Sequence, residues 1–85
     1  MYTREQLNEL VPPIVTESLG LIEPLKDDQT FESVDADSID LATLAIGIAE
    51  EFDKNMEIGD IDLDKIKTSN DIVEYLLAQQ ILNQQ

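Results

Sequence analysis

Cysteine, histidine and tryptophan are all absent from this 85-residue chain. Without cysteine it can form neither a disulfide framework nor a thiolate metal site, which is typical of a cytosolic protein. Without histidine it lacks the side chain that most often serves as a general base near neutral pH. A chain of this size also has a small core, with no room for a deep enzyme pocket. We therefore expect one domain, residues 1–85, that is not an enzyme.

Basic residues are scarce, because 5 of them stand against 19 acidic residues and the formal net charge is −14. Surfaces that bind nucleic acid are basic, so DNA and RNA are excluded as partners. No basic residue lies between Lys26 and Lys54, where acidic residues crowd. This pattern fits either a solvated acidic face or a docking surface for a basic partner.

Long apolar runs are also missing, and the N-terminal residues contain no hydrophobic signal region. The sequence therefore predicts neither secretion nor insertion into a membrane. We expect a cytoplasmic monomer.

Apolar residues recur at helical spacing in three segments, which predicts an all-α fold. The first segment follows a capping box formed by Thr3 and Gln6 and continues to Gly20. Pro12-Pro13 is expected to kink or break this helix, because proline lacks an amide donor and clashes with the preceding turn. Residues 21–34 then form a long loop, pinned to the core by Leu21, Ile22, Leu25, Phe31 and Val34.

The second predicted helix spans residues 39–52 and carries two apolar stripes at a period of 100° per residue. The stripe assigned to the core consists of Leu41, Leu44, Ala45, Ile48 and Phe52. The other stripe consists of Ile39, Ala42, Ile46 and Ala49. The second stripe either packs on the long loop or forms a contact strip for a partner.

The last predicted helix begins at a second capping box, in which Thr68 is the N-cap and Asp71 replaces the usual glutamate. A short helical turn over residues 62–67 is expected before it. The predicted fold is thus a small bundle of three main helices plus one short helix, with a long loop between the first two helices.

Ser38 lies where an acidic, turn-rich stretch meets the second helix. This position leaves its hydroxyl exposed beside backbone amides that lack intrahelical partners and can receive an anion. A nucleophilic serine needs an adjacent base, and the sequence supplies none within obvious reach. If Ser38 takes part in chemistry, another protein must supply the base. Otherwise Ser38 is a helix N-cap.

A calcium loop is the metal site that the acidic residues most nearly match, with Asp60, Asp62, Asp64 and Asp71 at ligand spacing. Lys65, however, stands where such a loop requires glycine. We expect no dedicated metal site.

The motif Asp37-Ser38-Ile39-Asp40, followed by a helix that ends in Glu50-Glu51-Phe52-Asp53, resembles the acyl carrier protein family, whose attachment motif is Asp-Ser-Leu-Asp or a close variant. Residues 64–68 and 71–76 resemble the third and fourth helices of that family. The resemblance covers nearly the whole chain. It implies a carrier that holds acyl groups as thioesters on a covalent 4'-phosphopantetheine arm derived from coenzyme A.

The resemblance also implies roles for individual residues. Ser38 is the expected attachment residue, and Asp37 and Asp40 flank it in the complex with a phosphopantetheinyl transferase. The partner-binding residues that it implies are Ile39, Asp40, Ala42, Ile46, Glu50 and Glu51. The residues expected to line an acyl chain, or to be plain core, are Leu44, Ile48, Phe52, Ile66 and Leu76.

The expected partners are the transferase and acyl-transfer, synthase or ligase enzymes with basic docking patches. The alternatives are a carrier of aminoacyl or polyketide units, and an unmodified acidic helical adaptor in which Ser38 is only a cap. Thr43 and Ala49 stand where carriers of fatty-acid synthesis commonly have acids. This difference suggests a specialised carrier with dedicated partners.

Overall fold

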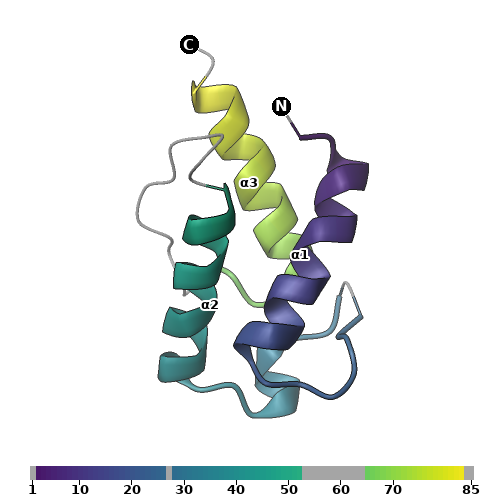
Figure 1. The fold of residues 1–85 in the computed structure, drawn as a ribbon, viewed down its shortest axis with the longest axis vertical. Coiled ribbons are helices and arrows are strands. Elements are labelled where there is room, and N and C mark those ends of the chain that lie inside the picture. The colour runs from purple at the N-terminus through teal and green to yellow at the C-terminus, as the bar shows by residue number, and fades with distance from the viewer. Residues whose placement is uncertain (1, 27, 53–64, 84–85) are drawn as a thin grey trace.

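The three predicted main helices are present and form one small bundle (Figure 1). The computed structural model describes residues 2–26, 28–52 and 65–83. Helix α1 spans Arg4–Ser18, α2 spans Ser38–Phe52 and α3 spans Ser69–Asn83, and a short 3₁₀ helix, η1, spans Phe31–Val34. The described residues contain no β-strand, only an isolated bridge between Thr30 and Thr68. The all-α prediction and the long loop between the first two helices are confirmed.

Helix α1 begins and ends as the sequence predicts. The Thr3 hydroxyl accepts a hydrogen bond from the Gln6 amide at 3.1 Å, and the Gln6 side chain accepts one from the Thr3 amide at 2.8 Å. At the other end, Gly20 takes a left-handed backbone conformation with φ of 65°. The amides of Gly20 and Leu21 donate to the carbonyls of Glu17 and Thr16, which is the Schellman arrangement.

Of the kink or break predicted at Pro12-Pro13, the break is wrong, because α1 continues through both prolines. The amides that proline lacks would have bonded the carbonyls of Asn8 and Glu9, and both of these residues are exposed to water. Buried apolar residues on either side of the prolines, Leu7, Val11 and Val15, hold the helix against the core. Tertiary packing therefore outweighs the local cost of the two prolines.

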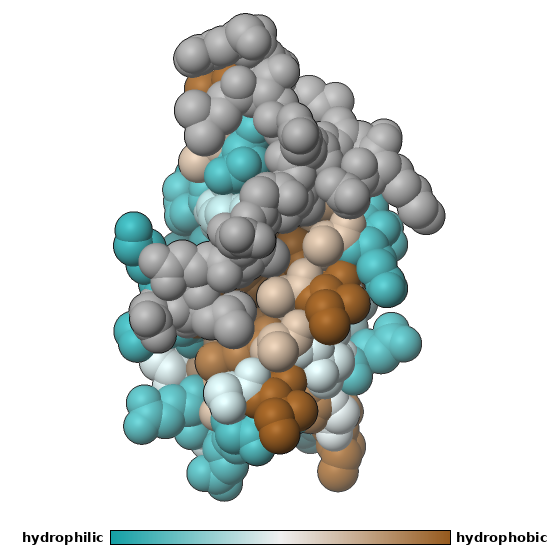
Figure 2. Space-filling view, turned by 90° about the vertical axis from the view of Figure 1, so that its left-hand side faces the viewer, coloured by the Kyte–Doolittle hydropathy of each residue, from teal (hydrophilic) through white to brown (hydrophobic). Residues whose placement is uncertain are grey.

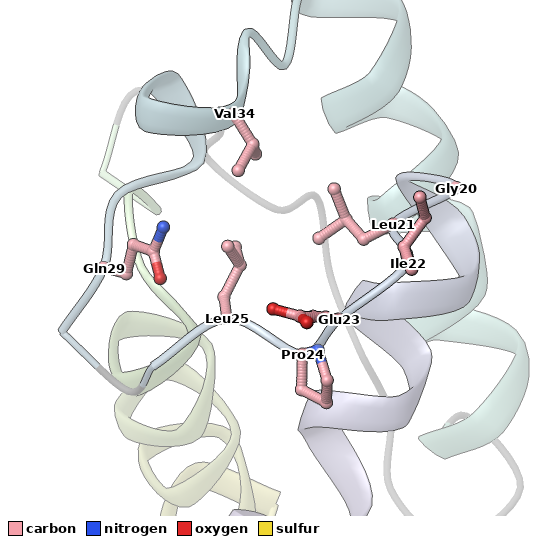
Figure 3. Close-up of a pocket in the computed structure, with 8 residues that line it drawn as sticks. All are labelled: Gly20, Leu21, Ile22, Glu23, Pro24, Leu25, Gln29 and Val34. Atoms are coloured by element: carbon pink, nitrogen blue, oxygen red, sulfur yellow. The ribbon is translucent and has the colours of Figure 1, made fainter.

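The loop between α1 and η1 is pinned to the core less completely than predicted. Leu25 and Phe31 are buried, and Leu21 and Val34 pack partly against the core, whereas Ile22 is 100% exposed. The loop curves around a surface hollow of about 570 Å³, whose lining residues are shown in Figure 3. The prediction that Ile22 is a core anchor is wrong, because the turn after Gly20 leaves its side chain in solvent.

The core is the place where the three helices and the loop meet. Its buried residues are Leu7, Val11, Val15, Leu25, Phe31, Leu44, Ile48, Phe52, Ile66, Ile72, Val73 and Leu76. Phe52 is completely buried at the end of α2, and its ring meets the ring of Tyr2 edge to face at a centroid distance of 5.2 Å. Aromatic pairs in this geometry contribute beyond the area that they bury.

Polar contacts connect the N-terminal segment to α3. The side-chain amide of the buried Gln80 accepts from the Tyr2 amide and donates to the Tyr2 carbonyl at 2.8 Å. Arg4 forms an ion pair with Glu74, in which the guanidinium donates a hydrogen bond to the carboxylate. This hydrogen bond lowers the pKa of the Glu74 carboxyl. Both partners of this pair are exposed, so it adds little to stability.

The second capping box is also confirmed. The Asp71 amide donates to the Thr68 hydroxyl at 3.1 Å, and the Asp71 carboxylate accepts from the Thr68 amide at 3.1 Å. The short helical turn predicted over residues 62–67 falls mostly outside the described residues, as do the acids 60–64 of the calcium pattern. Among the described helices, none is long and apolar enough to span a membrane.

Self-repulsion is expected to limit the stability of a chain with a formal net charge of −14. Raising the ionic strength from about 0.01 M to about 0.5 M shortens the Debye length from about 30 Å to a few ångströms. We expect the unfolding temperature, followed by circular dichroism, to rise by about 5 °C, the response of a small domain to about 1 kcal/mol. A flat or falling temperature would show that repulsion between the acids does not limit stability.

Candidate functional site

The 3₁₀ helix η1 directly precedes the N-terminus of α2 along the chain. Phe31 is buried at the start of η1 and anchors the segment, since its amide donates to the Lys67 carbonyl at 2.8 Å. Asp35 then takes a left-handed conformation with φ of 59°, and the amide of Ala36 donates to the Phe31 carbonyl at 3.2 Å. This turn ends η1 and directs residues 36–38 into α2.

Asp37, and not Ser38, caps α2. Its carboxylate accepts from the Asp40 amide at 2.9 Å, while the Asp40 carboxylate accepts from the Asp37 amide at 3.1 Å. The Asp37 carbonyl accepts the first helical hydrogen bond, from the Leu41 amide at 3.0 Å. The two aspartates therefore form a reciprocal capping box around Ser38. The alternative in which Ser38 itself is the N-cap is wrong, because the Asp37 carboxylate accepts from the Asp40 amide that the Ser38 hydroxyl would have bonded.

The Ser38 hydroxyl is consequently left free at the surface. Ser38 is exposed, and its hydroxyl makes no hydrogen bond to any residue in the described parts of the chain. Within those same parts, the amides of Ser38 and Ile39 also bond no carbonyl. These amides lie at the positive end of the 15-residue helix α2. An anion attached to the hydroxyl would meet two free donors and a favourable dipole.

The capping box predicts a stability difference between two acid-to-alanine variants. We expect Asp37→Ala to lower the free energy of unfolding by about 1 kcal/mol, the usual cost of losing an N-cap carboxylate. Glu32→Ala removes the same charge from an exposed residue whose side chain makes no contact in the capping box. We expect Glu32→Ala to be neutral or slightly stabilising in urea unfolding, and equal stabilities would contradict the cap.

The second apolar stripe of α2 faces solvent. Ile39 is 73% exposed and Ile46 is 60% exposed; Ala42 is exposed as well, and Ala49 is half-buried. Figure 2, which faces the side where α2 lies, shows apolar surface flanked by hydrophilic residues. The interpretation in which this stripe packs on the loop is therefore wrong for its first three residues. Glu50 and Glu51, at the end of the same helix, are also exposed.

The predicted acyl-lining residues Leu44, Ile48, Phe52, Ile66 and Leu76 are all buried in the core. Three of them, Leu44, Ile48 and Ile66, line a cavity of about 10 Å³. The other residues of its lining are Leu41, Ala45, Ile72 and Tyr75. Phe52 and Leu76 do not line it. This volume holds at most one water molecule, so an acyl chain would have to separate the packed side chains to enter.

Comparison with known proteins first defines the class of domain. Residues 13–76 match the family described as "Phosphopantetheine attachment site". The matched stretch contains the whole of α2, including Ser38 and its capping aspartates. The chain is therefore a phosphopantetheine-bearing domain, in agreement with the predicted cofactor.

Two curated relatives show which kind of phosphopantetheine-bearing domain the chain resembles. An "Acyl carrier protein" from Cyanidium caldarium is 37% identical over 79 residues, covering 91% of this chain and 90% of the relative. Another, from Thermotoga maritima, is 35% identical over 78 residues, covering 89% and 94%. The chain belongs to the acyl carrier protein family, whose members are carriers and not catalysts. Such proteins are modified by phosphopantetheinyl transferases and work with synthases and acyltransferases.

Proposed function

We propose that Ser38 is the residue to which 4'-phosphopantetheine is attached, and that the arm presents acyl thioesters to biosynthetic enzymes. The observation that carries this proposal is the free hydroxyl of Ser38 at a helix N-terminus whose cap is supplied by Asp37. A phosphodiester on this oxygen would lie beside the unbonded amides of Ser38 and Ile39. The residues present therefore fit the group.

The chain needs an enzyme to load it. In the proposed step, the Ser38 oxygen bonds to the phosphorus that carries pantetheine in coenzyme A. The pyrophosphate bond breaks, adenosine 3',5'-bisphosphate leaves, and the hydroxyl proton goes to a base. The sequence has no histidine, so the transferase supplies that base. Because the transferase carries out the chemistry in this step, the proposal is that the chain is a carrier and not itself an enzyme.

The exposed face of α2 is the proposed partner surface. It combines apolar side chains at Ile39, Ala42 and Ile46 with carboxylates at Glu50 and Glu51. An apolar centre flanked by charge suits a partner that has a complementary basic patch. Docking there brings the arm of Ser38 to the partner and raises its effective concentration.

The shared core of the three helices supports one carrier domain over residues 1–85.

Intact-mass measurement tests the proposal. The purified chain is incubated with coenzyme A and a phosphopantetheinyl transferase of broad specificity, and a second sample is incubated without the transferase. We expect the first sample to gain the mass of one phosphopantetheine and the second to gain none. No gain with several transferases would instead favour the unmodified acidic adaptor.

A further inference from the structure

A groove beside Ser38 lies between η1 and the segment that leads into α3. Its volume is about 250 Å³. Two of its lining residues, Ala36 and Leu41, stand on either side of Ser38 along the chain. The groove therefore begins next to the proposed attachment residue.

The groove has an apolar floor and a polar rim. Its buried and half-buried lining residues are all apolar, and they are Phe31, Ala36, Leu41 and Ile66. Its exposed lining residues are all polar, and they are Thr30, Glu32 and Lys67. Pantetheine has the same mixed character, since its methyl and methylene groups alternate with amides and a hydroxyl. An apolar hollow with a few polar groups at its edge is the usual form of a binding site for such a molecule.

Backbone hydrogen bonds hold Lys67 at this groove. The Ala36 amide donates to the Phe31 carbonyl at 3.2 Å, and the Phe31 amide donates to the Lys67 carbonyl at 2.8 Å. The Lys67 amide in turn donates to the Asp71 carboxylate at 2.9 Å. Because both backbone groups of Lys67 are bonded, its side chain starts from a fixed place in the wall of the groove.

The charge of Lys67 is not used within the described parts of the chain. Lys67 is the only basic residue among the described residues that line the groove, and its ammonium group forms no ion pair with any of the residues that the structure describes. Carboxylates surround Ser38, at Asp35, Asp37 and Asp40. A phosphodiester on Ser38 would add another negative charge there, and a nearby ammonium group would offset the repulsion.

We propose that this groove holds the pantetheine arm against the protein, and that Lys67 is a positioning residue that pairs with the phosphodiester. The lysine ammonium on its flexible stem would meet a phosphate oxygen. The methyl and methylene groups of the arm would cover Leu41 and Ile66 and remove apolar surface from water. Between encounters with partner enzymes, the arm would lie along the groove. This inference rests on the proposed function.

Two lysine-to-glutamine variants test the role of Lys67. Lys67→Gln removes the charge from the groove, whereas Lys26→Gln makes the same change at an exposed position outside its lining. The wild type and both variants are loaded with phosphopantetheine until intact mass shows that loading is complete. The unfolding temperatures of the loaded and unloaded forms are then compared at low ionic strength.

A group that binds only the folded state stabilises that state. We therefore expect loading to raise the unfolding temperature of the wild type and of Lys26→Gln by about 4 °C, and that of Lys67→Gln by less than about 2 °C. Equal gains for all three proteins, or no gain for the wild type, would overturn the role of Lys67.

Nuclear magnetic resonance of the loaded wild-type chain locates the arm directly. We expect nuclear Overhauser contacts between the methyl groups of the arm and the side chains of Leu41 and Ile66. A loaded chain without these contacts would overturn the groove alone. Failure of the wild-type chain to load would overturn the proposed function, and with it the arm that the groove is proposed to hold.

Discussion

Ser38→Ala is expected to abolish phosphopantetheine loading completely while leaving the fold intact. The loss is complete because the substitution removes the only atom that can form the proposed phosphodiester. The fold survives because Asp37 provides the cap and the Ser38 hydroxyl is exposed and unbonded to the described residues. The stability should change by less than about 0.5 kcal/mol, as for most surface substitutions. Intact mass and urea unfolding of the same sample measure both quantities.

Ser33→Ala is the matched control for this variant. Ser33 is also exposed and lies in η1, close to Ser38 along the chain. Its hydroxyl, however, is engaged, since it donates to the Thr30 carbonyl at 2.6 Å and accepts from the Gln29 side chain. We expect Ser33→Ala to load as the wild type does. Loading of Ser38→Ala, or its failure to fold, would contradict the separate roles assigned to Asp37 and Ser38.

Phe52→Ala is expected to have the largest effect on stability. Phe52 is 0% exposed, belongs to the central core and packs edge to face on Tyr2. Truncating a buried phenylalanine costs about 3–5 kcal/mol, through lost burial and the cavity left behind. At roughly 0.05–0.15 kcal/mol per residue, a domain of 85 residues is stable by about 4–13 kcal/mol in total. The variant should therefore lose a large fraction of the free energy of unfolding.

Ile46→Ala provides the comparison, because Ile46 lies on the same helix and is 60% exposed. We expect its unfolding free energy to stay within about 1 kcal/mol of the wild type. Far-ultraviolet circular dichroism during urea unfolding measures both variants. A cooperative transition for Phe52→Ala with a midpoint close to that of the wild type would show that Phe52 is not a central core residue.

Local features of the fold could be read from the sequence. The capping boxes at Thr3 and Thr68 were predictable because they depend on residues three positions apart. The core stripe of α2 was predictable because helical periodicity determines which residues share a face. The cap at Asp37 has the same local spacing to Asp40, so it could have been found. The adjacent serine was the more obvious candidate.

Features that depend on three-dimensional packing could not be read in this way. The continuity of α1 through Pro12-Pro13 depends on buried residues on both sides of the prolines. The exposure of Ile39 and Ile46 depends on where the long loop lies, which periodicity does not determine. The close approach of α1 to α2 at Gly47, which lies against Ser18 and Ile14, joins residues far apart in sequence.

The measurement that tests the central claim most directly is to locate the phosphopantetheine on the loaded wild-type chain. Peptide fragmentation by mass spectrometry can distinguish Ser38 from the other serines, Ser18, Ser33 and Ser69. We predict that the added mass lies on Ser38 alone. Phosphopantetheine on another residue would contradict the assignment of Ser38 as the attachment site.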